Sequence, residues 1–325
     1  MKHAKTYIAG DWGTSYLRLF LCSDGQVLES RTGPGVAQLA PDPAAFSRTV
    51  AELTGPWIRA YGPLPIRLSG MVGARTGWRE APYVPCPTDA AAVAASMLRF
   101  DVNGQEIAIS PGVSCVNPYG APDVMRGEET QVFGALAKSP AHGRHIFVLP
   151  GTHAKWVLVE DGRILGFQTS LSGELYGLLR DHSTLTRASS AAATNADTSF
   201  DLAAFERGAQ RARELHTAPL HHLLFETRSR QLIEAVPGHE ALAFLSGLII
   251  GQDVAGARRL LGELFDSCSR ISLIGSAPLT QLYQHALKAH DVEATIIDAS
   301  DATLSGLQTY AALAQCKETT RALTS

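Results

Sequence analysis

Several features that mark common classes of protein are missing from this sequence. The apolar runs fall short of the ~18 residues that a membrane-spanning helix needs, and the most apolar stretch, Leu242 to Gly251, is expected to be a buried helix. The apolar segment near the N-terminus stops at Asp11, too early for the core of a signal peptide, so we expect a cytoplasmic protein. The five cysteines are scattered and form no CxxC pair, which argues against a disulfide framework or a zinc site.

Charge and motif content exclude further classes. The formal net charge is −3 and there is no basic tail or stripe, so neither nucleic acid nor a membrane is an expected partner. The sequence contains no GxxxxGKS/T phosphate-binding loop, no HRD or DFG protein-kinase motif, no HExxH zinc motif and no GxSxG nucleophile elbow. Any phosphate binding must therefore rely on a different arrangement of the backbone.

What the sequence does contain is an extended α/β pattern. Its 325 residues are 45% hydrophobic, which suits two domains or one large unit with a sizeable core. Short apolar runs alternate with segments of helical periodicity. One such segment starts at Pro43 and ends at Gly62, residues that favour the start and the end of a helix. We therefore predict an α/β fold.

The segment IAGDWGTSYLRLFL, residues 8–21, predicts a β-hairpin with unusual polar residues at its turn. Asp11 ends the first strand, and the turn that follows contains Gly13, Thr14 and Ser15. A glycine turn lets backbone N–H groups approach an anionic oxygen, the hydroxyls add donors, and the carboxylate could hold a hydrated Mg²⁺. The alternative is an ordinary turn with an Asx-type hydrogen bond. Arg18, in the second strand, either faces a ligand or forms a salt bridge on the sheet surface.

A second hairpin of the same design occurs at LPGTHAKWVLV, residues 149–159. Gly151 and Thr152 could contact phosphate oxygens and Lys155 could add positive charge, whereas His153 is more typical of a hydrogen-bonded structural residue. Each hairpin is followed by an Asp-Gly turn and a third strand. We therefore predict two related α/β halves whose glycine turns face each other across a cleft, where ligands are often bound.

A third candidate turn lies later in the chain. The apolar run RISLI leads to Gly275 and Ser276, immediately before a predicted helix. A flat ring or a phosphate could bind at such a strand end beside a helix N-terminus. The alternative is an ordinary connection between a strand and a helix.

Carboxylates gather within PDVMRGEETQVFGALA, residues 122–137, which is predicted to be helical. Pro122 and Asp123 are expected to begin this helix. Glu128 or Glu129 could act as the general base that accepts a hydroxyl proton. The alternative is that the glutamates only complement the helix dipole. Adjacent residues on a helix point in different directions, so at most one glutamate is expected to face the reaction.

The segment SGMVGARTGWREAPYVPCP, residues 69–87, predicts a loop that combines glycine, arginine and aromatic residues. Such side chains suit a polyhydroxylated ligand, and arginine suits a carboxylate through paired N–H···O bonds. The alternative is a surface loop capped by a packed tryptophan. The candidate substrate-binding residues are Ser69, Gly70, Arg75, Trp78 and Arg126.

These motifs together resemble a known group of enzymes. The DxGT hairpin, the second GT hairpin and the late strand–glycine–helix turn resemble the sugar kinase–chaperone–actin ATPase superfamily. The longer phrases GMVGARTGWREAPYVPCP, PDVMRGEETQ, LPGTHAKWV, SGELYGLLRDHSTL and FLSGLIIG resemble the 2-dehydro-3-deoxygalactonokinase family, over residues 7–314. The resemblance implies an actin-like ATPase (ribonuclease H-like) fold of two domains with an interdomain cleft. It also implies ATP-dependent phosphorylation of the 6-hydroxyl of 2-dehydro-3-deoxy-D-galactonate in galactonate catabolism.

The resemblance also implies roles for residues of this chain. Asp11 would hold Mg²⁺. Glu128 would stand where related sugar kinases carry the catalytic aspartate of a Gly-Asp pair, with Glu129 and Asp123 as competitors. ATP would be bound by Gly13, Thr14, Gly151 and Thr152, to which the residue pattern adds Ser15 and Lys155. Gly275 and Ser276 would lie beside the adenosine, although GSAP here departs from the double glycine common in the superfamily.

Domain organisation and alternative functions complete the expectations. We predict an N-terminal sugar-binding domain that carries the first phosphate hairpin over residues 1–121, with residues 301–325 packing back on it. Residues 122–300 would form a C-terminal nucleotide-binding domain. The expected partners are ATP and a small sugar acid, and a homodimer is left open. The alternatives are a kinase for another sugar or sugar acid on the same scaffold, and a non-catalytic ATP-binding switch.

Overall fold

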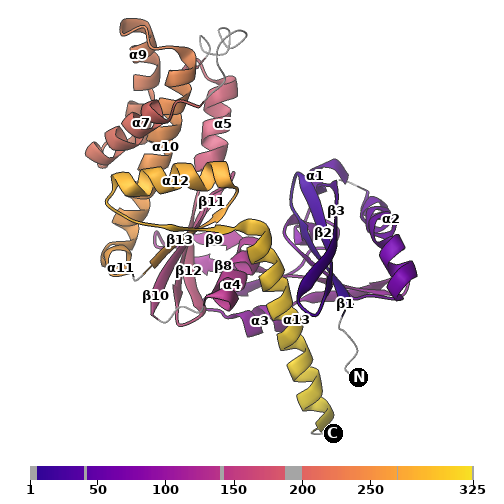
Figure 1. Ribbon diagram of the computed structural model, residues 1–325. Helices are drawn as coiled ribbons and strands as arrows, with labels where there is room; N and C mark the ends of the chain where they lie inside the picture. The colour runs from indigo at the N-terminus through magenta and orange to yellow at the C-terminus, as the bar shows by residue number, and fades with distance from the viewer. Residues whose placement is uncertain (1–5, 40–41, 140–142, 187–199, 269, 324–325) are drawn as a thin grey trace. The chain divides into compact units, whose positions relative to one another are not determined.

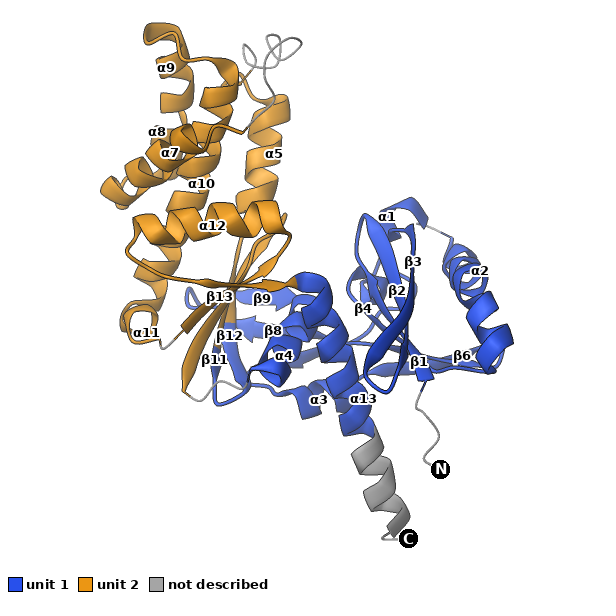
Figure 2. Ribbon diagram, in the orientation of Figure 1, with its two compact units in different colours: residues 1–142, 159–166, 299–325 blue, residues 143–158, 167–298 orange. Residues whose placement is uncertain are grey.

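The computed structural model describes residues 6–39, 42–139, 143–186, 200–268 and 270–323, whose helices and strands are drawn in Figure 1. The chain divides into two compact units, which Figure 2 colours separately. Unit 1 comprises residues 1–142, 159–166 and 299–325, and unit 2 comprises residues 143–158 and 167–298. Each unit has its own hydrophobic core and β-sheet, so the predicted α/β class is confirmed.

Unit 1 is built around a six-stranded sheet with the order β3-β2-β1-β4-β7-β6. The first three strands are antiparallel neighbours, whereas β4 is parallel to β1 and β7 is parallel to β4. Pairing of β1 with β2 confirms the first predicted hairpin. The strands are β1 (Thr6–Trp12), β2 (Tyr16–Ser23), β3 (Gln26–Pro34), β4 (Ile66–Ser69), β6 (Leu98–Val102) and β7 (Gln105–Ile109).

The helix α2 (Pro43–Tyr61) shows how local sequence sets an element of unit 1. The Asp42 side chain accepts a hydrogen bond from the backbone N–H of Ala44, and Gly62, at φ 81°, ends the helix. The predicted start and end of this helix are therefore confirmed. The other helices of the unit are α1 (Val36–Leu39), η1 (Met71–Gly73), α3 (Ala90–Ala95), α4 (Glu128–Lys138) and α13 (Ala299–Leu323).

A small three-stranded sheet in unit 1 corrects one prediction. It has the order β5-β8-β9, with β5 (Tyr83–Pro85), β8 (Gly112–Val116) and β9 (Pro122–Met125). The prediction that Pro122 and Asp123 begin a helix is wrong, because both residues pair with β8 in the antiparallel strand β9. Gly127 then turns the chain at φ 106°, and α4 begins only at Glu128.

Packing of α4 against α13 places residues 122–142 in unit 1, whereas the predicted domain boundary lay after residue 121. The two helices approach each other at glycines. A Cβ added to Gly134 would lie 1.8 Å from the carbonyl oxygen of Ala302, and one added to Gly306 would lie 2.0 Å from that of Thr130. Contact at this range is open only to glycine, so α4 and α13 meet backbone to backbone.

Unit 2 contains a five-stranded sheet with the order β12-β11-β10-β13-β14. Its strands are β10 (Arg144–Leu149), β11 (Ala154–Glu160), β12 (Arg163–Ser170), β13 (Arg270–Gly275) and β14 (Thr295–Asp298), and residues 159–166 cluster with unit 1. The order repeats that of β3-β2-β1-β4-β7. The second turn of each half is also the same, because Asp24-Gly25 and Asp161-Gly162 all have positive φ. The repeat confirms the expected fold of two ribonuclease H-like halves.

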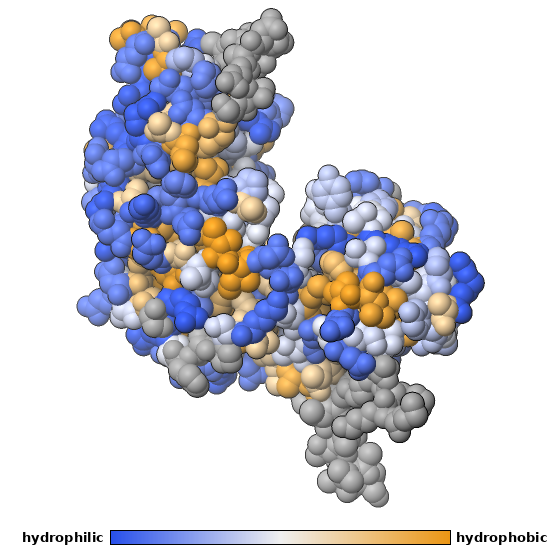
Figure 3. All heavy atoms as spheres, viewed as in Figure 1, coloured by the Kyte–Doolittle hydropathy of each residue, from blue (hydrophilic) through white to orange (hydrophobic). Residues whose placement is uncertain are grey.

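The helices of unit 2 surround a long central helix, α10 (Gly238–Leu261). By length and composition α10 could cross a membrane, but most of its apolar stretch is buried inside the unit, as predicted for Leu242 to Gly251. Hydrophilic side chains cover most of the face in Figure 3, and apolar ones form separate patches. The other helices among the described residues of unit 2 are α5 (Ser172–His182), α7 (Leu202–Glu214), α8 (Leu220–Leu224), α9 (Glu226–Ile233), α11 (Glu263–Asp266) and α12 (Ala277–Ala289).

Helix α7 packs tightly on α10 through glycine. A Cβ added to Gly208 would lie 2.2 Å from the Phe244 carbonyl oxygen, and one added to Gly247 would lie 2.0 Å from that of Phe205.

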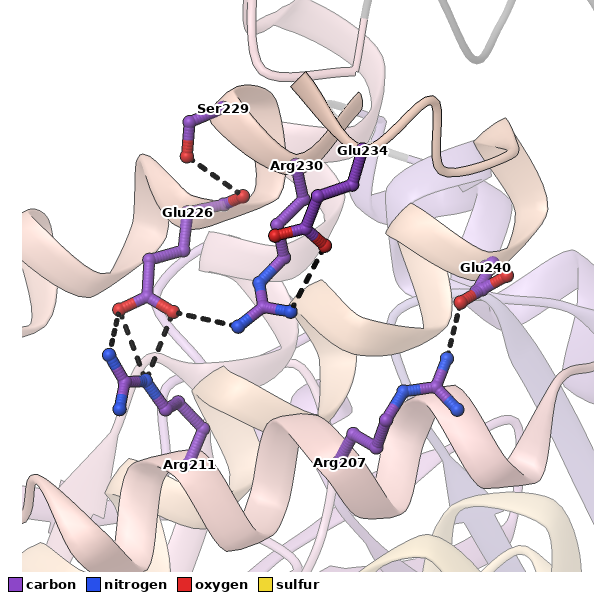
Figure 4. A network of polar contacts seen from close by, with 7 residues as sticks. All are labelled: Arg207, Arg211, Glu226, Ser229, Arg230, Glu234 and Glu240. Atoms are coloured by element: carbon purple, nitrogen blue, oxygen red, sulfur yellow. Dashed lines mark hydrogen bonds and ion pairs between the residues drawn. The ribbon is translucent and has the colours of Figure 1, made fainter. Parts of the chain in front are cut away.

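An ion-pair network, drawn in Figure 4, connects α9 to α7. Its centre is Glu226, which pairs with Arg211 of α7 at 3.0 Å and with Arg230 of α9 at 3.6 Å.

Candidate active site

The first candidate turn, between β1 and β2, is held by the helix that follows β3. The carbonyl oxygens of Gly13 and Thr14 accept hydrogen bonds from the backbone N–H groups of Val36 and Ala37, each at 3.0 Å. The side chains of Thr14 and Ser15 are exposed, so both hydroxyls are available to a ligand. The predicted phosphate-binding hairpin therefore has a fixed backbone and accessible hydroxyl donors.

Asp11 lies at the carboxyl end of β1, beside the end of the parallel strand β4. Its Oδ2 accepts a hydrogen bond from Nη2 of Arg18 at 2.6 Å, and Nη1 of Arg18 donates to Oγ of Ser300 at 2.5 Å. Of the two alternatives for Arg18, the structure supports the salt bridge, and the partner is the candidate metal ligand. Gly70 lies next to Asp11 at φ 97°, where a Cβ would be 2.8 Å from the carbonyl oxygen of Trp12.

The N-terminus of α4 meets the same end of the sheet. A Cβ added to Gly127 would lie 3.1 Å from Cα of Gly70, so the turn before α4 contacts the turn after β4. Glu128 is half-buried, and its Oε2 accepts a hydrogen bond from the backbone N–H of Arg126 at 3.0 Å. The structure thus brings the predicted base close to the glycine beside Asp11.

Glu129 has a different environment, because it is fully buried. Its carboxylate accepts hydrogen bonds from the Gly127 backbone N–H at 2.6 Å, from Oγ1 of Thr130 at 2.8 Å and from Oγ of Ser110 at 3.3 Å. Burial, and then the charge of Glu128, raise the pKa of Glu129 to about 7. Glu129 therefore supports the turn from inside the unit. Asp123, the third candidate base, lies in β9.

Two of the predicted substrate-binding residues turn their side chains into the interior. Ser69 is buried, and its hydroxyl lies 2.8 Å from Oγ1 of Thr130. Trp78 is buried in the core, where its ring stacks on Phe46 and meets Phe100 edge-on. This placement differs from the predicted contact with a sugar and matches the packed tryptophan of the alternative interpretation. Aromatic packing outweighs ligand contact here because the ring fills the space above the sheet.

The two candidate arginines differ sharply. The Arg75 side chain is 87% exposed, and its Nε lies 3.6 Å from Glu80. Arg126 is buried beneath the ring of Tyr83, 4.3 Å from the ring centre, and its Nη2 donates to the Ala81 carbonyl oxygen at 2.8 Å. Nε and Nη1 of Arg126 have no hydrogen-bond partner among the described residues. A buried guanidinium with unpaired N–H donors can form charge-assisted hydrogen bonds with an anionic group.

In unit 2, the second candidate turn is held against the start of α5. A Cβ added to Gly173 would lie 2.2 Å from the carbonyl oxygen of Gly151, and the Glu174 N–H donates to the Thr152 carbonyl oxygen at 2.9 Å. His153 Nε2 lies 2.5 Å from the Glu174 carboxylate, which fits the structural role expected for this histidine. A Cβ added to Gly151 would meet nothing within 4 Å, so the space beside this glycine is open.

Lys155 and the late turn complete the candidate groups of unit 2. Lys155 is buried, with Nζ 3.4 Å from the carbonyl oxygen of His153 in the same turn. Gly275 ends β13, and a Cβ there would lie 3.6 Å from the Pro150 carbonyl oxygen. Ser276 is exposed at the N-terminus of α12. The structure therefore brings the second and third candidate turns together within unit 2.

Sequence reasoning missed one polar group near these turns, Asp253 of α10. Its carboxylate accepts hydrogen bonds from Trp156, Ser172 and Tyr283. The signal in the sequence was a carboxylate inside the apolar helix LSGLIIGQDVAGA. Such a residue is rarely tolerated without partners.

Nearly the whole chain is similar to known proteins. The family model described as 2-keto-3-deoxy-galactonokinase matches residues 11–310. A protein of Rhizobium meliloti (strain 1021), named "Probable 2-dehydro-3-deoxygalactonokinase DgoK1", is 38% identical over 313 residues, 96% of this chain and 98% of its own length. The 2-dehydro-3-deoxygalactonokinase of Escherichia coli (strain K12) is 34% identical over 307 residues, 94% of this chain and 97% of its own.

A solved structure shows the same relationship in three dimensions. The "Crystal structure of a putative 2-dehydro-3-deoxygalactonokinase protein from Sinorhizobium meliloti" has a TM-score of 0.83 and 36% sequence identity to this chain. The match covers 94% of this chain and 98% of that one. The chain therefore belongs to the 2-keto-3-deoxy-galactonokinase family, whose members are sugar-acid kinases.

Proposed function

We propose that this chain transfers the γ-phosphate of ATP to the 6-hydroxyl of 2-dehydro-3-deoxy-D-galactonate. The products are 2-dehydro-3-deoxy-6-phospho-D-galactonate and ADP. The names of the relatives and the charges of the candidate site support this substrate. A cytoplasmic location and a role in galactonate catabolism follow from the same proposal.

The observation that carries the proposal is the state of Arg126. Its Nε and Nη1 are buried without partners among the described residues. Gly73 packs directly against this group, because a Cβ there would lie only 3.0 Å from Nη1. An unmet buried donor is costly, and a carboxylate would satisfy it with a charge-assisted bond. A sugar acid supplies that carboxylate, whereas a neutral hexose does not.

Glu128 is the proposed catalytic carboxylate. It is half-buried at the first residue of α4, and the turn it stabilises touches Gly70 beside Asp11. From this position it would orient the 6-hydroxyl and accept its proton as phosphoryl transfer proceeds. Glu129 is less suited to contact a substrate because its carboxylate is fully buried and holds three donors.

Asp11 is the proposed ligand for Mg²⁺, and its chemistry fits that ion. Mg²⁺ prefers oxygen ligands and is commonly bound by one or two carboxylates together with waters and substrate phosphates. Among the described residues no group of three His, Cys, Asp or Glu side chains could hold a metal. A single carboxylate that shares its ion with a nucleotide is consistent with this donor set. When bound, Mg²⁺ would neutralise charge on the phosphates.

Each unit has its own proposed nucleotide contacts, at its glycine turns. In unit 1 the exposed hydroxyls of Thr14 and Ser15, with Gly13, would bind phosphate oxygens. In unit 2 the turn at Gly151 and the ammonium group of Lys155 would also bind phosphate oxygens. The Gly275-Ser276 turn would lie beside the adenosine. The residues of unit 2 are Gly151, Thr152, Lys155, Gly275 and Ser276.

An assay of ADP release tests the proposed function. The purified protein is given ATP and Mg²⁺ with 2-dehydro-3-deoxy-D-galactonate, its gluconate epimer, neutral hexoses or no sugar. We expect turnover with the galactonate derivative and little without an acceptor. A preference for a neutral hexose would instead indicate another sugar kinase. Turnover that is independent of any sugar would indicate an ATP-binding switch.

A further inference from the structure

Asp253 of α10 connects three elements of unit 2 through its carboxylate. Its Oδ1 accepts a hydrogen bond from Nε1 of Trp156 in β11 at 3.0 Å. Its Oδ2 accepts from Oγ of Ser172 at the start of α5, at 2.8 Å, and from the hydroxyl of Tyr283 in α12, at 2.6 Å. Burial raises the pKa of Asp253, and the hydrogen bonds from these three donors, together with a smaller one from Ser170, oppose that rise.

The bond to Ser172 leads to the second candidate turn. Ser172 is the first residue of α5, and the next two residues contact that turn. Gly173 packs against the Gly151 carbonyl oxygen, where a Cβ would be 2.2 Å away. The N–H of Glu174 donates to the Thr152 carbonyl oxygen at 2.9 Å. Asp253 therefore fixes the part of α5 on which the turn rests.

The other two bonds lead to the remaining candidate groups. Tyr283 is buried in α12, the helix that begins directly after the Gly275-Ser276 turn. In the first turn of that helix Thr280 lies against Gly275, with its Cγ2 3.1 Å from the place a Cβ would take. Trp156 is buried in β11, next to Lys155 in the sequence. One carboxylate is thus bonded to the strand that contains Lys155, to the helix that follows the Gly275-Ser276 turn, and to the helix that supports the second turn.

We propose that Asp253 is a positioning residue that holds the second and third glycine turns of unit 2 in the arrangement that binds ATP. This inference rests on the proposed nucleotide site. A carboxylate suits the task because it accepts several hydrogen bonds and has no donor to conflict with them. An amide of the same shape offers one acceptor oxygen and an NH₂ group, so at least one of the three donors loses its partner.

The test is Asp253→Asn, with ATP binding measured by calorimetry in the absence of sugar. We expect the variant to bind ATP about tenfold more weakly, because a hydrogen bond to a charged acceptor is lost under the turns. The KM for the sugar acid should stay within about twofold of the wild-type value, since its proposed contacts are in unit 1. A loss of stability alone would not produce this split between the two substrates.

Ser272→Ala is the matched control. Ser272 is a buried hydroxyl of unit 2 that bonds to His145 at 3.1 Å and to Thr295 at 2.7 Å, outside the candidate turns. It should lower the melting temperature and leave ATP affinity unchanged. Wild-type ATP affinity in Asp253→Asn, or an equal loss with Ser272→Ala, would overturn the proposed positioning role.

Two milder variants keep the test decisive if Asp253→Asn does not fold. Ser172→Ala and Tyr283→Phe each remove one donor and leave Asp253 with two. Each should weaken ATP binding severalfold without changing the KM for the sugar acid, and unchanged ATP affinity in both would refute the inference. Failure of the wild-type protein to bind ATP would instead refute the proposed function.

Discussion

Replacement of Arg126 by methionine tests whether this arginine binds substrate or only supports the fold. The change removes the hydrogen bond to the Ala81 carbonyl oxygen, about 1.5–3 kcal/mol for a charged donor, and the contact with Tyr83, about 0.5–2 kcal/mol. It also removes two buried nitrogen donors, Nε and Nη1, that lack partners among the described residues, each unfavourable by about 1–3 kcal/mol. These contributions are of similar size and opposite sign. The free energy of unfolding should therefore change by less than about 2 kcal/mol.

The effect on substrate binding should be much larger. If the carboxylate of the sugar acid takes both unmet donors, two charged hydrogen bonds of about 1.5–3 kcal/mol each are lost. The sum, about 3–6 kcal/mol, corresponds to a 10²- to 10⁴-fold fall in kcat/KM for the sugar acid, at about 1.4 kcal/mol per factor of ten. The KM for ATP should stay near its wild-type value. Coupled measurement of ADP release gives the kinetic constants, and calorimetry gives the stability.

Arg75→Met is the control for this experiment. Arg75 is exposed, and its one ion pair among the described residues is a long one with Glu80, so its removal should change stability by less than about 1 kcal/mol. If Arg126→Met unfolds readily and keeps its kcat/KM, Arg126 is a structural residue and the reasoning above is refuted. If Arg75→Met carries the kinetic loss instead, Arg75 is the carboxylate ligand.

Three further predictions follow from the same contacts. Glu128→Gln should lower kcat about 10²-fold or more, with ATP affinity unchanged, and an unchanged kcat would exclude it as the base. The Glu129 pKa is raised from 4.5 to about 7 in the folded protein, so its contribution to stability should be full below pH 4.5 and disappear as pH rises toward 7. Urea unfolding of wild type and Glu129→Gln across this range would show the wild type losing stability relative to the variant as pH rises. Gly247→Ala should destabilise the protein by about 1–3 kcal/mol. Gly256→Ala in the same helix, where a Cβ meets nothing within 4 Å, should stabilise it by about 0.5–1 kcal/mol. Equal melting temperatures of the two variants would contradict the close packing of α7 on α10.

The two hairpins could be predicted from the sequence because their signals are local. Asp11 and Gly13 lie between two apolar segments, each long enough for one strand. Two such segments also flank Gly151. The two strands of each hairpin are adjacent in the sequence and pair with each other, so the hairpin can be predicted without knowledge of distant contacts. The helix from Pro43 to Gly62 was predictable for the same reason, since its capping residues lie within it or next to it.

The parts that could not be predicted depend on contacts between distant segments. Pro122 and Asp123 have the chemistry of a helix start, but β8 pairs with them and makes them a strand. The residues around Trp78 are typical of a ligand-binding loop, but its ring packs against Phe46 and Phe100 in the core. The three donors that meet Asp253 come from segments 30 to 97 residues away. Tertiary packing decides such positions, and local propensity does not record it.

The division of the chain into units has a consequence for the order in which they can form during synthesis. Unit 1 is interrupted by unit 2 and is completed by α13, which packs against α4 through Gly134 and Gly306. On a ribosome, residues 143–298 emerge before α13 is made. Unit 2 can therefore close its core while α4 still exposes the face that α13 later covers. The first half of the protein is thus the last to be finished, and variants at the α4–α13 contact should impair maturation of the nascent chain more than variants buried in unit 2.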